Sequence, residues 1–362
     1  MLNLSLSIEL NQDITYNHPH TSFKLDGIFY DNIGLSSLAQ QMLSEGEHFS
    51  VSLGVFITKW VDSCSEIELQ TSGSTGDPKT VLMSKQAMVN SAIATGDYFK
   101  LKPGDSALSC LPFEYIAAKM MFVRAYVLGL ELDCIHPSSK PLETVSRRYD
   151  FCAMVPLQVE NCIDALHHIK TLIVGGAKLS NGLKSKLTKL QTTVYETFGM
   201  TETVSHIAVK EILESSSLFE ALPSVSFAID TRNCLTIIAP HLVSKPIQTN
   251  DVVKLSSNTT FEWLGRYDTI INSGGIKISP EQLEQKLEGF IKERFFITSQ
   301  KDNSLGEIVV IVIEGSKSND TISFKVLDPI QRPKRVYYLH QFKETVSGKI
   351  KRQETFNLIK PE

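Results

Sequence analysis

Along the middle of the chain, hydrophobic positions recur first with the period of a strand, then of a helix, then of a strand again. Residues 171–174 form a short apolar run that Gly175-Gly176 breaks. Residues 180–190 have the apolar spacing of an amphipathic helix, and residues 192–198 are rich in residues that favour strands. The pattern predicts strand, helix, strand.

A second patterned stretch lies near the C-terminus. Ser279-Pro280-Glu281-Gln282 has the form of a capping box with proline at the first helical position, so it predicts the start of a helix. The expected apolar face of this helix consists of Leu283, Leu287, Phe290 and Ile291. Strands are expected to follow at 295–298 and 308–313. This order predicts an α/β core followed by a small α+β unit.

Composition limits the class of protein. The chain has 362 residues, of which 42% are apolar and 21% charged, which is typical of a globular protein of about two domains. A net charge of −4 argues against a nucleic-acid partner. The longest β-branched run, 308–313, is far shorter than the roughly 20 residues of a membrane span. The N-terminus lacks a signal-peptide pattern, and the cysteines form no C-x-x-C pair, so we expect a cytoplasmic protein without membrane insertion.

Charge is distributed unevenly along the chain. Residues 266–362 carry 16 Lys and Arg against 13 Asp and Glu, a net charge of +3, and residues 1–265 carry −7. The basic excess is either a solvated face or a small basic domain that closes over phosphates bound by the larger one.

The strongest chemical signal is a segment of hydroxyls and glycines that ends in a lysine. Glycine lets backbone N–H groups approach a phosphate, Ser and Thr add donors, and lysine adds charge. Pro78 stands where the Walker motif requires glycine, so this is a different phosphate loop. The segment comprises Thr71, Ser72, Gly73, Ser74, Thr75, Gly76, Asp77, Pro78 and Lys79.

This loop resembles the signature loop of the adenylate-forming superfamily, which includes acyl-CoA synthetases, luciferases and nonribosomal adenylation domains. Four further segments resemble the motifs of that superfamily in the same order. They are Gly175-Gly176-Ala177, Phe198-Gly199-Met200-Thr201-Glu202, Leu264 to Asp268 with its continuation to Glu281, and Ser347 to Arg352. The resemblance implies a large N-terminal α/β domain, 1–265, and a small mobile α+β domain, 266–362, with a hinge at Asp268.

The resemblance also implies a role for each motif. The loop from Thr71 to Lys79 would hold the β- and γ-phosphates of ATP, and Thr75 and Glu202 would bind Mg²⁺. Thr201 would donate to the α-phosphate. The adenine side would comprise Gly175, Gly176, Ala177, Phe198 and Gly199, and the ribose side Asp251 and Arg266. Asn250 replaces the family's glycine before Asp251, so a turn carboxylate remains an alternative for Asp251.

Lys349 has the largest implied role. A carboxylate that attacks the α-phosphate brings two anions together, and a lysine there offsets their repulsion. The alternative interpretation of Lys349 is a solvated lysine of the basic C-terminal stretch.

Two departures from the family bear on the acid. The signature loop begins only 70 residues into the chain, so part of the usual N-terminal region is reduced. Tyr115 replaces the histidine of a family P-x-x-H-x-x-G pattern, and Lys119 is the first residue after the end of that pattern. A cation beside the acyl pocket suits a substrate with a second carboxylate. Lys119 and Arg124 are five residues apart, so only one of them is expected to point inward; the alternative for Lys119 is a surface position.

Within the superfamily the chain therefore looks like an o-succinylbenzoate–CoA ligase of menaquinone biosynthesis. The expected substrates are a small carboxylic acid, ATP with Mg²⁺, and coenzyme A. Three alternatives remain: an enzyme that loads a carrier protein, a CoA ligase for another aromatic or fatty acid, and a non-catalytic binding protein. The sequence leaves a homodimer open.

Overall fold

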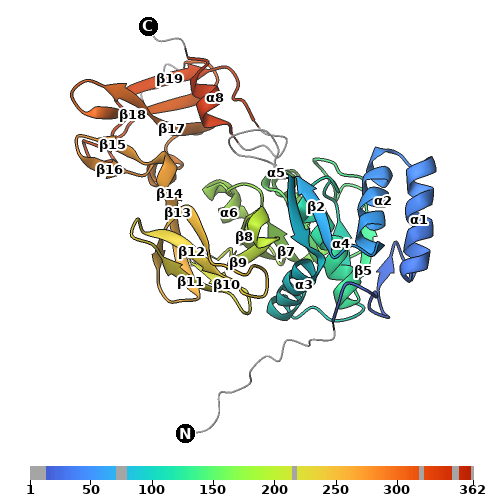
Figure 1. Cartoon of the computed structure of the whole chain (residues 1–362). Helices are drawn as coiled ribbons and strands as arrows, with labels where there is room; N and C mark the ends of the chain where they lie inside the picture. Colours follow the sequence, from blue (N-terminus) through green and yellow to red (C-terminus); the bar gives the residue numbers. More distant parts are fainter. Residues whose placement is uncertain (1–13, 71–79, 214–217, 318–321, 345–349, 360–362) are drawn as a thin grey trace.

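The computed structural model describes residues 14–70, 80–213, 218–317, 322–344 and 350–359. Figure 1 shows a large unit built around one sheet, and a smaller unit formed by the C-terminal segments. No helix in these ranges has both the length and the apolar character needed to cross a membrane.

The large sheet has twelve strands, and the pairing of neighbouring strands changes from parallel to antiparallel halfway across the sheet. The first six strands in spatial order are parallel to one another: β1 (Lys24–Leu25), β5 (Glu131–Cys134), β4 (Ser106–Ser109), β6 (Tyr149–Met154), β7 (Ile169–Val174) and β8 (Thr193–Gly199). The other six are antiparallel: β9 (His206–Glu211), β10 (Phe219–Ala221), β14 (Thr260–Arg266), β13 (Ile247–Leu255), β12 (Cys234–Ile238) and β11 (Ser226–Ile229). Ligands of such sheets bind at the carboxyl ends of parallel strands.

Helices cover both faces of the parallel half. Alternate strand residues point to opposite faces, so Ile173 joins one core and Leu172 the other. The first face is covered by α1 (Asn32–Glu45), α2 (His48–Val61), α3 (Lys85–Phe99) and α4 (Ile116–Leu128). The second face is covered by α5 (Pro156–Asn161), the short helix Ile163–His168 and α6 (Asn181–Leu187).

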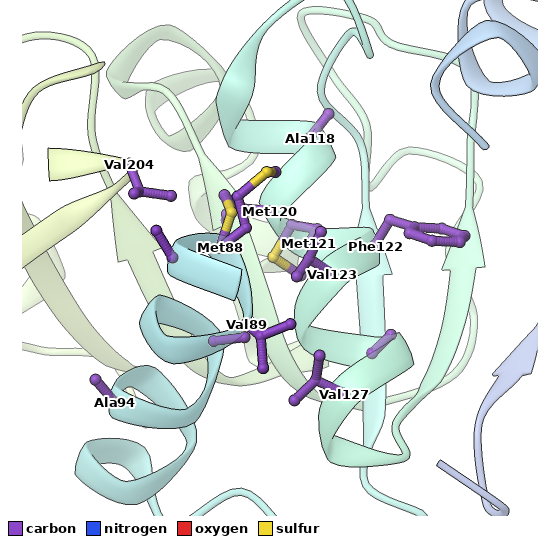
Figure 2. Packing of buried hydrophobic residues seen from close by; sticks show 14 of the residues in the cluster. Met88, Val89, Ala94, Ala118, Met120, Met121, Phe122, Val123, Val127 and Val204 are labelled. Atoms are coloured by element: carbon purple, nitrogen blue, oxygen red, sulfur yellow. The ribbon is translucent and has the colours of Figure 1, made fainter. Parts of the chain in front are cut away.

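Helix α4 is buried on nearly all sides. Nine of its 13 residues are buried, and its alanine, methionine and leucine residues are good helix formers. Figure 2 shows Met88 of α3 beside Met120 and Met121 of α4, while Phe122 points away from α3. The helix ends where Gly129 adopts a left-handed conformation, φ 74°. A polar side chain at one of the buried positions of this helix is therefore removed from water.

A second sheet begins after β14 ends at Arg266. The short helix Tyr267–Thr269 follows, and the sheet has the order β16-β15-β18-β17, with β19 also paired to β18. The elements of this C-terminal part of the chain, two of which are helices, are β15 (Ile271–Ser273), β16 (Ile276–Ile278), α7 (Pro280–Leu287), β17 (Phe295–Asp302), β18 (Gly306–Glu314), β19 (Arg335–Leu339) and α8 (Arg352–Phe356). A separate hairpin pairs β2 (Glu66–Gln70) with β3 (Thr80–Ser84). The division into domains at 265/266, with mobility of the second, stays a prediction.

The predicted strand–helix–strand is confirmed as β7, α6 and β8, although α6 is shorter than expected. The strands expected at 295–298 and 308–313 are also confirmed. The predicted helix start is confirmed, with Ser279 as the N-cap residue and Pro280 as the first residue of α7, but the capping box is wrong, because the Ser279 hydroxyl donates to the carbonyl of Leu264 at 3.0 Å. Phe290 is also misplaced: α7 ends at Leu287, and the Phe290 side chain is 60% exposed.

The reversal from parallel to antiparallel pairing depends on a close backbone approach at Gly199, the last residue of β8. The β8–β9 register shifts between Phe198 and Gly199. A β-carbon at residue 199 would lie 2.4 Å from the carbonyl oxygen of Ser205 and 2.6 Å from the Cα of His206. Only glycine fits there without moving β9.

We predict that Gly199→Ala lowers the free energy of unfolding by at least about 1–3 kcal/mol, the usual cost of overpacking, because the obstructing atoms are backbone. Urea unfolding measures this change. Gly182→Ala is the matched control: a β-carbon at residue 182 in α6 would have no atom within 4 Å, and alanine favours a helix by about 0.5–1 kcal/mol. Equal stability of the two variants would contradict the tight approach.

Candidate active site

The predicted adenine-side turn lies at the carboxyl end of β7. Gly176 adopts φ 87°, a conformation that favours glycine. The hydroxyl of Thr197 in β8 donates to the Val174 carbonyl at 3.1 Å, and a β-carbon on Gly175 would lie 2.6 Å from that hydroxyl. Gly175, Gly176 and Ala177 are thus held beside the end of β8, on the edge where parallel sheets bind ligands.

Phe198 stands at the end of β8 and is half-buried. Its ring packs edge-on against Phe261 at 5.2 Å and at a tilt against Phe219 at 5.7 Å. These contacts fix the ring beside Gly199, where the resemblance expects a flat surface for adenine.

The turn after β8 exposes one carboxylate. Residues Thr201–Thr203 form a short helix in which Glu202 is exposed and Thr203 is fully buried. The Thr203 hydroxyl donates within this turn, with the carbonyls of Met200 and Ser205 at 2.9 and 2.8 Å. An exposed carboxylate on a hydrogen-bonded turn fits Mg²⁺, which uses one or two protein carboxylates together with phosphate oxygens and water.

Val204 is the strained residue of this turn. It has φ 66° and ψ −56°, although its side chain is β-branched, and it is fully buried in the core that includes α3 and α4. Figure 2 shows Val204 on the same side of α4 as Met88 and Met120. Such strain costs about 1–3 kcal/mol and is concentrated at functional sites. The strain lies between Glu202 and Ser205.

The two predicted ribose residues are neighbours across strands β13 and β14. Asp251 pairs in register with Arg266, and Asp251 is only 6% exposed. Asp251 lies inside a strand, so the alternative of a turn carboxylate is wrong. Its Oδ1 accepts the indole N–H of Trp263 at 2.9 Å.

Arg266 also contacts the predicted hinge residue. Its guanidinium donates to both oxygens of Asp268, at 2.9 and 2.7 Å. This hydrogen-bonded pair raises the pKa of Arg266 above its ordinary value. A cavity of about 170 Å³ adjoins Arg266 and is lined also by Gly265, Lys277 and Ser279. Arg266, which is predicted to bind the ribose, is therefore hydrogen-bonded to the predicted hinge residue Asp268.

The structure places the two candidate cations of the acid pocket on different sides of α4. Lys119 donates to the Glu114 carbonyl at 3.1 Å, and the carboxylate of Glu114 accepts from Ser52 of α2. Burial, followed by the nearby Lys59, lowers the pKa of Lys119. Tyr115 precedes α4 as its N-cap residue and is half-buried. Lys119 thus faces α2.

Arg124 faces the opposite side and is only 2% exposed. Its Nη2 donates to the Ser205 hydroxyl at 3.3 Å and to Nδ1 of His206 at 3.4 Å, and its Nη1 approaches the sulfur of Met121 at 3.7 Å. Its Nε is buried without an acceptor among the described residues. Burial lowers its pKa to about 9, so the guanidinium remains charged at neutral pH.

Within the described residues, Arg124 has no carboxylate partner, and burial is the only cause of its pKa shift. A buried charge is ordinarily paired, because desolvation without a partner is costly. The described residues thus supply Arg124 with no anion, and a carboxylate is the group that fits a guanidinium best.

The sequence reasoning missed the residues around this guanidinium. Ser205 and His206 follow the strained turn, and Ser91 and Thr95 lie one helical turn apart in α3. Ser91 and Thr95 are both buried, at 2% and 0% exposure. Two hydroxyls four residues apart on a helix of small apolar residues were the available signal.

Several predicted site residues lie outside the described residues. They are Thr71, Ser72, Gly73, Ser74, Thr75, Gly76, Lys79 and Lys349. The described strands β2 and β3 pair up to Gln70 and Thr80, the residues that flank the first of these segments. Their predicted roles stay predictions.

Known proteins match this chain over most of its length. Residues 69–232 match the family of AMP-binding enzymes. A solved structure of an acyl-CoA synthetase (AMP-forming)/AMP-acid ligase II-like protein from Dyadobacter fermentans is 33% identical, covers 89% of this chain and 98% of its own, and has a TM-score of 0.60.

More distant relatives are named for one acid. A 2-succinylbenzoate–CoA ligase of Lactococcus lactis is 23% identical over 79% of this chain and 69% of its own. An o-succinylbenzoate coenzyme A synthetase from Bacillus subtilis, solved with ATP and magnesium, is 18% identical over 80% of this chain and 69% of its own, with a TM-score of 0.70. By the motifs, the sheet and these likenesses, the chain belongs to the AMP-binding family of AMP-forming acyl-CoA synthetases and AMP–acid ligases.

Proposed function

We propose that the protein is an AMP-forming ligase that activates o-succinylbenzoate with ATP and transfers the acyl group to coenzyme A, a step of menaquinone biosynthesis. Relatives named for this acid support the proposal, as does the buried Arg124. o-Succinylbenzoate has one aliphatic carboxylate to activate and one ring carboxylate to recognise. ATP and CoA are cytoplasmic substrates, so we expect the enzyme to act in the cytoplasm.

The observation that carries the choice of acid is the unpaired charge of Arg124. A helix turns 100° per residue, so side chains five positions apart point about 140° away from each other. Lys119 is directed to α2 by its bond to Glu114, and Arg124 therefore faces α3 and β9. We assign recognition of the ring carboxylate to Arg124 in place of Lys119, because of the two only Arg124 is fully buried without an anion among the described residues.

ATP would bind at the carboxyl ends of β7 and β8. The Gly175–Ala177 turn and the ring of Phe198 would contact adenine, and the exposed carboxylate of Glu202 would hold Mg²⁺, which neutralises phosphate charge when bound. Thr201, one residue before Glu202, would donate to the α-phosphate. The Asp251–Arg266 pair would bind the ribose hydroxyls.

Two half-reactions follow from this placement. In the first, an oxygen of the aliphatic carboxylate attacks the α-phosphorus of ATP and pyrophosphate leaves, with Lys349 offsetting the repulsion between the anions. In the second, the sulfur of CoA attacks the acyl carbon, the thiol proton goes to solvent, and AMP leaves. We propose that residues 266–362 rotate about Asp268 between these steps, exchanging the Arg266–Asp268 contact as they do so.

The reaction class is tested by the products. Wild-type protein, ATP, Mg²⁺ and o-succinylbenzoate should release pyrophosphate, and adding CoA should yield AMP and the acyl-CoA, both measured by chromatography. ADP in place of AMP would contradict the class. AMP without thioester, together with transfer to a carrier protein, would identify the acceptor as that carrier and not CoA.

The acid is tested by a matched pair of substitutions. Arg124→Met should raise the KM for o-succinylbenzoate by about 10- to 150-fold, which corresponds to about 1.5–3 kcal/mol for a hydrogen bond to a charged group. It should leave the KM for ATP and for benzoylpropionate, the same acid without its ring carboxylate, nearly unchanged. Lys119→Met is the control and should leave all three values nearly unchanged. The reverse result for the two variants would return ring-carboxylate recognition to Lys119.

A further inference from the structure

The imidazole of His206 lies between Arg124 and Thr95. His206 is 8% exposed, its Nδ1 lies 3.4 Å from Nη2 of Arg124, and its Nε2 lies 3.5 Å from the Thr95 hydroxyl. The ring of Phe99 is edge-on at 6.4 Å. Among the described groups around the imidazole, Arg124 is the one that bears charge.

Two separate contacts bear on the protonation state of this imidazole, one at each ring nitrogen. A guanidinium has only donors, so the nitrogen that faces Arg124, Nδ1, must be an acceptor without a proton. The Thr95 hydroxyl already donates its proton to the Ser91 carbonyl at 2.9 Å, so it can only accept from Nε2. The Arg124 contact therefore requires a neutral imidazole with its proton on Nε2, and the Thr95 contact agrees with that proton position.

This imidazole restricts the guanidinium in turn. Nη2 has two N–H groups, and the acceptors beside it are Nδ1 of His206 and the hydroxyl of Ser205. The Ser205 hydroxyl is itself 2.8 Å from that of Ser91, so α3 anchors both acceptors. In the described part of the chain, Nε has no acceptor, and Nη1 has only a weak one in the Met121 sulfur. These donors are the ones left for an incoming carboxylate.

We propose that His206 is a positioning residue that, as a neutral Nε2-protonated imidazole, holds the Arg124 guanidinium in the orientation that selects acids with a second carboxylate. The inference rests on the proposed function for its substrate, while the state of the imidazole is independent of it. Burial, and then the charge of Arg124, lower the pKa of His206 well below its ordinary value, in agreement with the neutral form.

The first test needs no activity. ¹⁵N NMR of the full chain, with the His206→Asn spectrum used for assignment, reports which ring nitrogen carries the proton. We expect an unprotonated Nδ1 and a protonated Nε2 that do not change between about pH 6 and pH 8, the range in which an ordinary histidine titrates. A proton on Nδ1, or titration of the ring within this range, would overturn the proposal.

The second test separates positioning from packing. His206→Asn keeps an acceptor at the place of Nδ1 and should leave the KM for o-succinylbenzoate within about threefold of wild type, whereas His206→Leu removes the acceptor and should raise it about tenfold or more. Neither variant should change the KM for ATP or benzoylpropionate, and the exposed His167→Asn should change none of them. Equal effects of Asn and Leu, or an equal rise for benzoylpropionate, would show that His206 only packs.

The proposed function and the role of His206 can be contradicted separately. If wild-type protein releases no pyrophosphate with o-succinylbenzoate, the proposed function is wrong whatever the NMR shows. If wild-type protein is active and His206→Leu keeps its KM, the proposed function stands and the role of His206 is wrong.

Discussion

A guanidinium buried in the core, to which the described residues offer no anion, is the constraint on which the rest of this account depends. Arg124 loses its hydration in α4, yet the described part of the chain offers it a hydroxyl, an imidazole and a thioether in place of a carboxylate. Neutral acceptors satisfy part of the hydrogen-bonding capacity of a guanidinium but leave its charge. The fold therefore maintains an unfavourable site, and a substrate carboxylate is the simplest group that would relieve it.

Under the proposed function, one turn of the chain would contribute to both the nucleotide site and the acid site. Glu202 and Ser205 are three residues apart, with Val204 strained between them, and Gly199 lets β9 return close beside β8. The Thr203 hydroxyl is hydrogen-bonded to the carbonyls of Met200 and Ser205, at the two ends of the turn. A displacement of Glu202 on binding Mg²⁺ and phosphate would therefore also displace the backbone of Ser205. The packing of Val204 against the α3–α4 core joins this turn to the helices that bear Thr95 and Arg124.

The sequence predicted local structure well where one period dominates. The strands and helix from β7 to β8 followed from apolar spacing, and β17 and β18 from β-branched runs. The start of α7 was also predicted, but its side-chain cap was not, because the Ser279 hydroxyl bonds to Leu264 of β14 and so does not cap its own helix. Motif order predicted that Asp251 and Arg266 act together, and the two residues lie in register on neighbouring strands, although their role toward ATP stays a prediction. Spacing alone could not decide between Lys119 and Arg124, because the choice depends on which neighbour, α2 or α3, packs against each side of α4.

The most direct measurement is the free energy of unfolding of Arg124→Met in urea, with and without o-succinylbenzoate. Replacing an unpaired buried ion with an apolar side chain is often neutral or stabilising, so without the acid the variant should be at least as stable as wild type. With the acid at about 100 times its dissociation constant, wild type should gain about 2.7 kcal/mol and the variant almost nothing. A loss of about 3–5 kcal/mol in the variant without any acid, as expected when a buried pair is broken, would show that the chain itself already neutralises Arg124 and would contradict the account.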